Sequence, residues 1–331
     1  MTSSSSKNSR YISSLFVVRK KRGDHLFYGL VIGAAAYTLL MVGLVAFSVA
    51  KGSTDIFAKE GFNFITQSNW DAVEGRESFG AYPYIIGTLL SAGIAMLIGV
   101  PISLGIAIFI SEIAPPRIGT PLAFLSELLA AVPSIIYGLW ALFVFRFWVR
   151  DLVEKPLYDA FHAYVPFFAK TPFGLDIFTA GVVLAIMIIP IVSSICREIM
   201  KVVPDSQREA AYSLGATRWE TVRTAVFPYV KSGLVGASML GLGRAVGETI
   251  LVTMIIGNVI GPNAIPTTLF SQGQTLASLV ANEFNEASSD LHLSALIALG
   301  AILLVLTMGI NIAALIMVKK KVKVQSGAKS Q

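Results

Sequence analysis

Six apolar stretches, each long enough to cross a lipid bilayer, limit most strongly how this chain can fold. A transmembrane helix needs about 20 predominantly apolar residues, and a backbone inside lipid must satisfy its own hydrogen bonds. The sequence therefore predicts an all-α integral membrane protein, a multi-pass protein of the cell membrane. The six predicted spans are residues 26–50, 83–111, 119–145, 175–196, 232–260 and 293–318.

The composition agrees with this class of protein. Of the 331 residues, 54% are hydrophobic and 14% are charged, whereas charged residues make up about 25% of a typical soluble domain. Pro101, Pro133 and Pro190 lie inside the second, third and fourth predicted spans. We expect kinks at these positions, because proline lacks the N–H that a helix interior uses.

Basic residues gather on one side of the predicted spans. The two ends of the chain and the loops 112–118 and 197–231 hold 18 Lys and Arg, whereas the loops 51–80, 146–174 and 261–292 hold 7. Because cytoplasmic loops carry an excess of Lys and Arg, both termini are predicted to be cytoplasmic. The net charge of +6 thus reports topology, and it gives no indication of nucleic-acid binding.

The topology divides the chain into three parts. Residues 1–25 form a basic cytoplasmic N-terminus, residues 26–318 form the six-helix transmembrane domain with its core at 79–318, and residues 319–331 form a basic cytoplasmic tail. We expect the tail to be disordered. Its Lys residues favour contact with the anionic headgroups of membrane lipids.

Two charged residues lie inside the fifth apolar stretch. Arg244 and Glu248 are four positions apart, so a continuous helix would place both on one face. A charge near the bilayer centre costs at least about 2.5–3.5 kcal/mol, so it persists mainly at a protein interior or a watery path. Two interpretations remain open: a structural ion pair, or an Arg244 that contacts an anion crossing the membrane while Glu248 positions it. We expect the glycines of the same stretch to pack against neighbouring helices: Gly236, Gly241, Gly243 and Gly247.

Glu127, in the third predicted span, is a further buried charge. It could face Arg244, line a pathway, pair with a partner subunit or have a purely structural role. No cluster of His, Cys, Asp and Glu has the spacing of a metal site, so neither a metal nor a catalytic residue is predicted.

The loop 197–231 has the pattern of two short helices. Ser206–Glu209 and Thr217–Glu220 each match a capping box. Gly215 lies between them and suits a left-handed turn, and Pro228 is expected to close or kink the second helix. A helix pair of this kind is suited to docking into a groove of a partner protein.

The same loop resembles the EAA loop of permease subunits of ATP-binding-cassette importers. The resemblance rests on Glu209, Ala210 and Ala211, on Gly215, and on Pro228 thirteen positions later. In that family the loop inserts into an ATPase subunit, so the resemblance implies that the first four residues couple this chain to such a partner. The chain has no G-x-x-x-x-G-K-[ST] motif. ATP-Mg is therefore expected on the partner, with no cofactor in this chain.

Within those importers, the chain resembles the phosphate-transport (Pst-type) permeases, and PstC-type subunits more than the paralogous PstA-type subunits. The resemblance implies a type I importer permease (MetI-like) fold with phosphate as the cargo. The implied partners are a second, PstA-like permease subunit, a dimer of PstB-like ATP-binding subunits and a PstS-like phosphate-binding protein. The stretches that carry the resemblance are 79–89, 126–140, 208–222, 241–250 and 278–287.

Arg244 then becomes the expected contact for phosphate, roughly 18 Å into the fifth span at 1.5 Å per residue, with Glu248 and Glu127 on the substrate pathway. Other functions stay open: a permease for another oxyanion, a proton-coupled secondary transporter that uses Glu248 and Glu127 as a relay, and a membrane sensor without transport. The EAA loop and the lack of an obvious inverted repeat count against the secondary transporter. The loop 261–292, with a short helix expected at 274–286, is a candidate docking surface for a substrate-delivering protein.

Overall fold

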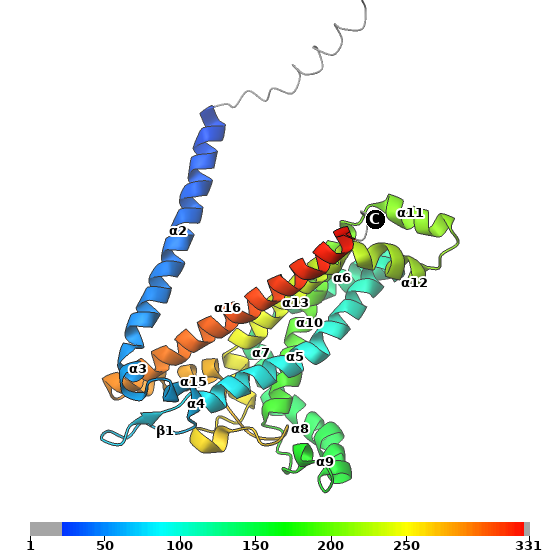
Figure 1. Ribbon diagram of the computed structural model, residues 1–331. Coiled ribbons are helices and arrows are strands. Elements are labelled where there is room, and N and C mark those ends of the chain that lie inside the picture. The colour runs from blue at the N-terminus through cyan, green and yellow to red at the C-terminus, as the bar shows by residue number, and fades with distance from the viewer. Residues whose placement is uncertain (1–21, 328–331) are drawn as a thin grey trace, which may run out of the picture. The chain divides into compact units, whose positions relative to one another are not determined.

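The computed structural model describes residues 22–327, and nearly all of their regular structure is helical (Figure 1). The chain forms two units, Met1–Lys51 and Gly52–Gln331. Residues 1–21 of the predicted N-terminal segment and residues 328–331 of the predicted tail lie outside the described residues.

The first unit consists mainly of one long helix, α2 (Arg22–Gly52). Its side chains from Phe27 to Ala50 are exposed or half-buried although most of them are apolar. A helix that is apolar on all sides is stable when lipid surrounds it. The prediction of a helical first span at 26–50 is confirmed.

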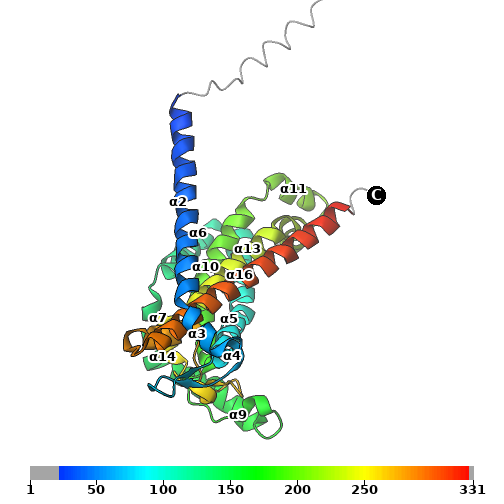
Figure 2. The same cartoon turned by 60° about the vertical axis from the view of Figure 1, so that its left-hand side comes forward.

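In the second unit, α10 (Ile177–Lys201) is the central helix of a bundle. It packs against α5 (Tyr82–Ile108), α6 (Pro116–Ala130) and α13 (Phe227–Gly247). Figures 1 and 2 both show α16 (Asp290–Gly327) lying along α13. Buried apolar side chains of α10 form much of the core, so this helix holds α5, α6 and α13 together.

The third predicted span, 119–145, is a broken helix. α6 ends at Ala130 and α7 (Ser134–Trp140) begins after Pro133, and the two parts meet at an angle of 89°. The break occurs here because Pro133 lacks an N–H and pushes Val132 away from helical geometry.

The described part of the chain contains five helices long and apolar enough to cross a membrane, or six if the bent pair counts as one span. The predicted all-α architecture with six spans is therefore confirmed. Pro101 and Pro190 lie inside the continuous helices α5 and α10. Of the three prolines, only Pro133 lies at a break of its span.

The fifth predicted span begins earlier than expected. A helix runs from α12 (Arg218–Thr221) through a π-helical turn (Val222–Val226) into α13. The prediction that Pro228 closes the second helix is wrong, because the helix continues past it to Gly247. A kink at Pro228 stays a prediction. Pro228 lies in the first turn of α13, directly after the π-helical turn, where the regular hydrogen-bond ladder is already interrupted.

The same span also ends earlier, at Gly247. Glu248 is extended (ψ 126°), and a short helix, α14 (Ile250–Ile255), follows. The apolar run 232–260 is thus one long helix, a break and a short helix.

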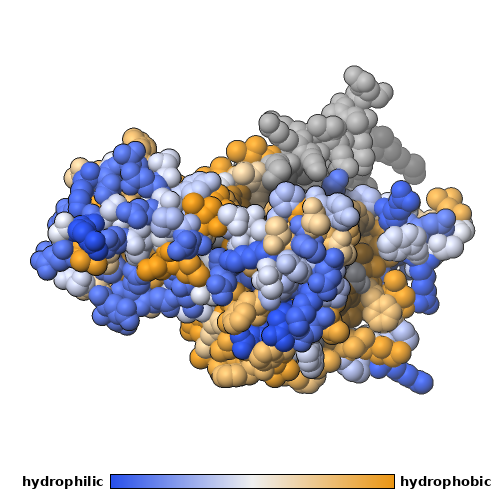
Figure 3. Space-filling view, turned by 90° about the horizontal axis from the view of Figure 1, so that it is seen from below, coloured by the Kyte–Doolittle hydropathy of each residue, from blue (hydrophilic) through white to orange (hydrophobic). Residues whose placement is uncertain are grey.

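A small cap lies at one end of the bundle. Its hairpin pairs Trp70 with Phe79, and its helix α15 confirms the short helix expected at 274–286, with a capping box between Thr275 and Ser278. Figure 3 shows that hydrophilic residues cover much of this end. The cap elements are α3 (Thr54–Glu60), α4 (Asn63–Thr66), β1 (Trp70–Asp71), β2 (Ser78–Phe79), α15 (Leu276–Glu283) and the 3-10 turns Gly261–Ala264 and Phe284–Glu286.

Glu283 on α15 contacts both the hairpin and α16. Its Oε2 accepts a hydrogen bond from Nε1 of Trp70 (2.7 Å) and lies 3.0 Å from Nε2 of His292 on α16. The His292 ring also stacks on Phe79, with 5.3 Å between ring centres. These contacts fasten the hairpin and α15 to the start of α16.

The segment after α7 is also helical, and it is fastened to α10 by buried carboxyl groups. Thr179 donates its hydroxyl to Glu154 (2.7 Å) and its backbone N–H to Asp176 (2.8 Å), and both carboxyl side chains are fully buried. The segment comprises a π-helical turn (Ala141–Phe145), α8 (Arg146–Val149), a second π-helical turn (Arg150–Glu154), α9 (Lys155–Phe161) and the 3-10 turn Pro166–Phe168.

The C-terminal tail differs from its prediction. α16 continues to Gly327, so the expectation of disorder is wrong for residues 319–327. No Gly or Pro interrupts the chain between Ile310 and Gly327, and the helix therefore meets no breaker before that glycine.

We expect Gly87→Ala to destabilise the fold, because a Cβ there would lie 2.2 Å from the backbone carbonyl oxygen of Gln274. Overpacking of this kind costs about 1–3 kcal/mol. Gly93→Ala on the same helix is the control, since nothing lies within 4 Å of its Cβ position. Thermal unfolding of the purified protein measures both, and equal melting temperatures would contradict the packing seen here.

Candidate functional site

The loop between α10 and α13 forms two helices that project from the bundle (Figure 1). α11 (Asp205–Ser213) begins directly after Pro204, and no side chain caps its first turn. The predicted capping box at Ser206–Glu209 is therefore wrong, because the extended Pro204 starts the helix before Ser206. The second predicted box is confirmed: Thr217 accepts from the N–H of Glu220, and Glu220 accepts from the N–H of Thr217.

Gly215 has φ +83° and so adopts the left-handed conformation predicted for it. Nothing lies within 4 Å of its Cβ position, so the requirement for glycine comes from the backbone alone. Beside it, Glu209 and Ala210 are exposed and Ala211 is half-buried. Leu214 is 89% exposed.

Arg208 anchors the inner side of α11. Its guanidinium forms a fork with Glu112, with Nε–Oε2 at 3.0 Å and Nη2–Oε1 at 2.9 Å. It also donates to the carbonyl oxygens of Val203 (2.7 Å) and Met200 (3.0 Å). The hydrogen bonds with Glu112 raise the pKa of Arg208 above its ordinary value.

Sequence analysis missed this ion pair. Glu112 lies in a π-helical turn (Phe109–Ile113) that continues α5, and its side chain is only 6% exposed. The signal in the sequence was Glu112, a carboxylate at the end of an apolar run. Its partner, Arg208, is 96 positions away, so sequence spacing does not connect the two.

Arg244 lies near the end of α13 and is exposed. Among the side chains that the structure describes, no carboxylate lies within ion-pair distance of it. Arg244 lies in the last turn of α13, just before the break of the fifth span. At the break of the third span, the hydroxyl of Tyr137 donates to the Leu129 carbonyl at the end of α6 (3.0 Å).

The prediction that Arg244 and Glu248 share a helix face is wrong. The helix ends at Gly247, so the i,i+4 relation no longer places the two side chains together. Glu248 instead accepts a long hydrogen bond from the N–H of Leu251 (3.4 Å) at the start of α14. The interpretation of these residues as a structural ion pair loses its geometric basis.

Glu127 does not face Arg244. It forms an ion pair with Arg197 on α10, and Arg197 also contacts Glu198 at 2.8 Å. The Arg197 side chain is only 9% exposed. Sequence analysis missed this partner, although Arg197 directly follows the predicted span 175–196. The same residues line a cavity of about 520 Å³.

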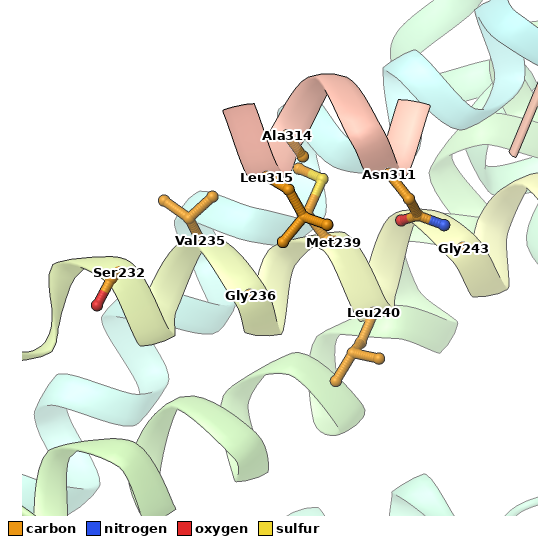
Figure 4. Close-up of a pocket in the computed structure, with 9 residues that line it drawn as sticks. All are labelled: Ser232, Val235, Gly236, Met239, Leu240, Gly243, Asn311, Ala314 and Leu315. Atoms are coloured by element: carbon orange, nitrogen blue, oxygen red, sulfur yellow. The ribbon is translucent and has the colours of Figure 1, made fainter. Parts of the chain in front are cut away.

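A second cavity, of about 600 Å³, opens between α13 and α16 (Figure 4). Gly236 and Gly243 line it, and nothing lies within 4 Å of their Cβ positions or of that of Gly247. Gly241 differs, since its Cβ position is 2.5 Å from Val192 on α10. The expected packing role is thus found within this chain for Gly241, whereas the other three glycines leave an open helix face.

Comparison with known proteins finds membrane transport components, in agreement with the bundle of membrane-spanning helices described above. Residues 99–323 match the family described as "Binding-protein-dependent transport system inner membrane component". The chain is 44% identical to the phosphate transport system permease protein PstC of Haemophilus influenzae over 95% of both chains. It is 42% identical to PstC of Mesorhizobium japonicum, over 86% of both chains.

The fold agrees with solved importers. A structure of the MetNI methionine ABC transporter has a TM-score of 0.50 at 17% identity, over 73% of this chain and 94% of that one. A bacterial ABC transporter involved in the import of alginate has a TM-score of 0.53 at 14% identity, over 90% and 96%. The chain belongs to the binding-protein-dependent transport system inner membrane components and, among them, to the PstC permeases.

We expect Arg197→Gln to lower the stability of the protein by about 1–3 kcal/mol, because a guanidinium that is only 9% exposed loses its hydrogen bonds to Glu127 and Glu198. Lys201→Gln is the control. It removes an ion pair to the same Glu198, but both side chains are more than half exposed, and such pairs contribute about 0–1 kcal/mol. Melting temperatures of the purified variants measure the difference. A loss in Lys201→Gln as large as that in Arg197→Gln would contradict this assignment.

Proposed function

We propose that this protein is the membrane-spanning permease subunit of an ATP-driven phosphate importer. Its PstC relatives carry phosphate transport in their names, and the exposed α11 loop is suited to docking. The single observation that carries the proposal is Arg244, a cation at the end of a long apolar helix with no carboxylate to neutralise it among the described side chains.

Arg244 is suited to bind a phosphate ion as it passes. A guanidinium is always charged and offers a planar fork that matches two phosphate oxygens, which a Lys ammonium does not. The extended backbone at Glu248 lies four residues further along, and irregular backbone at membrane depth is tolerated where it lines a cavity. These features support a watery path beside Arg244.

We propose that Glu248, four residues further along the chain, weakens this attraction. A carboxylate near the path makes the local field less positive, and a transport site must release its ion as well as bind it. Glu127 is a weaker candidate for the pathway, because Arg197 already neutralises it. That pairing also disfavours a proton relay between Glu248 and Glu127.

The α11 loop is the proposed contact with a partner ATPase. Glu209, Ala210 and Gly215 are exposed on this loop and Ala211 is half-buried beside them. The partner, a dimer of PstB-like subunits, would bind ATP-Mg. Hydrolysis would then switch the permease between an outward and an inward state. A PstA-like second permease subunit and a PstS-like phosphate-binding protein complete the proposed assembly. The open face of α13 suits packing against another helix.

The orientation follows from the distribution of basic residues, which favours cytoplasmic termini. The α11 loop then lies in the cytoplasm with the ATPase, and the cap lies outside. Single cysteines at Glu74 and Asn285 should react with an impermeant thiol reagent outside intact cells, in a Cys196→Ala background. A cysteine at Gln325 should not react, and its labelling from outside would reverse the proposed topology.

We expect Arg244→Gln to abolish phosphate uptake while the complex still assembles, because a neutral amide cannot replace the charged fork. Arg244→Lys should retain part of the uptake. Lys231→Gln, another exposed cation on the same helix, is the control and should leave uptake unchanged. Uptake into vesicles and yield of the purified complex are the measurements. Near-normal uptake by Arg244→Gln would remove this residue from the pathway.

We expect Gly215→Ala to reduce the phosphate transported per ATP hydrolysed, since a Cβ at φ +83° costs about 1–2 kcal/mol and misaligns α11. Gly75→Ala is a matched control. Gly75 also has a positive φ (+85°) with nothing near its Cβ position, but it lies in the cap. Loss of stability without loss of coupling is expected for the control. Unchanged transport per ATP in Gly215→Ala would argue against the docking role of the loop.

A further inference from the structure

One guanidinium connects three parts of the bundle at the proposed cytoplasmic end. Arg208 belongs to α11, its acceptors Met200 and Val203 lie in and just after the last turn of α10, and Glu112 lies in the π-helical turn that ends α5. A second contact reaches the same turn, because Arg218 of α12 donates to the carbonyl of Ile113 (3.0 Å). Both loop helices are therefore attached to the end of α5.

The two sides of α11 differ in what they contact. Arg208 and Ala211, three positions apart, are half-buried, whereas Glu209 and Ala210 are exposed. The outer side is thus free to meet a partner, and the inner side is held by Arg208. A partner that displaces α11 would therefore strain the hydrogen bonds of Arg208 first.

The Arg208–Glu112 pair has the geometry to carry such a pull. The exposed fractions of its side chains are 18% and 6%, so solvent screens it less than a surface pair. Two parallel N–H···O bonds also fix the relative orientation of the groups, which a single contact does not. By contrast, the contact of Arg208 with Asp205 (3.2 Å) stays within α11, and Asp205 is 90% exposed.

The end of α5 is a suitable point to receive the movement. α5 packs against α10 and also against α13, which carries Arg244. The turn that holds Glu112 is π-helical and leads directly to α6, and π-helical turns are frequent at functional sites. A shift of Glu112 would therefore reach the helices around the proposed pathway.

We propose that the Arg208–Glu112 ion pair transmits the movement of α11 to α5, so that both are positioning residues for transport. The proposal rests on the proposed function, since it needs a partner ATPase that moves α11. It assigns to this pair a role in coupling that is separate from docking by the exposed residues of the loop.

The test uses the complete complex, with its partner permease subunit and ATPase, reconstituted into lipid vesicles. The binding protein is added with phosphate bound to it. In Glu112→Gln we expect assembly and ATP hydrolysis to persist, while phosphate transported per ATP falls about fivefold or more, the usual range for coupling between sites. Glu112→Asp keeps the charge and should retain more transport per ATP than Glu112→Gln. Asp205→Asn is the matched control. It removes the other carboxylate that contacts Arg208 and should leave phosphate transported per ATP unchanged.

The amount of phosphate transported per ATP hydrolysed distinguishes transmission from a purely structural role. If Glu112→Gln lowers complex yield or melting temperature but leaves phosphate per ATP unchanged, the pair is only an anchor and the proposal is overturned. If Glu112→Gln does not assemble, Arg208→Lys, which keeps the charge and loses the fork, is judged by the same ratio. Failure of both variants to assemble would also reject a role in transmission.

The wild-type complex and Gly215→Ala keep this result apart from the proposed function. If the wild-type complex moves no phosphate, the proposed function itself fails. If the wild-type complex transports phosphate and Gly215→Ala is uncoupled while Glu112→Gln is not, only the role of the ion pair fails.

Discussion

Lipid offers no hydrogen bonds to a backbone, and this one constraint explains where the chain is regular and where it is not. The spans stay helical except at two breaks, after Ala130 and after Gly247. At each break a side chain hydrogen-bonds a backbone group: Tyr137 donates to the carbonyl of Leu129, and Glu248 accepts from the N–H of Leu251. Protein groups thus stabilise the backbone at both breaks, and Arg244 lies in the last turn before the second of them.

Features that depend on neighbouring residues could be predicted from the sequence. The apolar runs gave the spans because span length is set by bilayer thickness. Gly215 and the box at Thr217–Glu220 followed from turn and capping chemistry, which involves residues three or four positions apart. The box at Ser206–Glu209 failed for the same local reason, because the helix begins at Asp205 after Pro204, so Ser206 lies inside the helix and cannot cap it.

Features that depend on tertiary contacts could not be predicted. Glu127 and Arg197 are 70 positions apart, and Glu112 and Arg208 are 96 apart, so no spacing rule joins them. The spacing rule applied to Arg244 and Glu248 assumed a continuous helix and failed where the helix ended. The open faces of Gly236, Gly243 and Gly247 likewise depend on which helices this chain places beside α13. Sequence identified the charged candidates, whereas their partners required the fold.

The distribution of carboxylates separates Arg197 and Arg208 from Arg244, the proposed contact for phosphate. Arg197 and Arg208 are each largely buried and each contacts two carboxylates, as burial of a charge requires. Arg244 has no such neighbour among the described side chains, although it lies in an apolar helix. A permanent carboxylate would compete with a passing anion for the same N–H groups, and displacing it would slow transport. A cation that none of the described side chains neutralises therefore fits the proposed transient binding of phosphate.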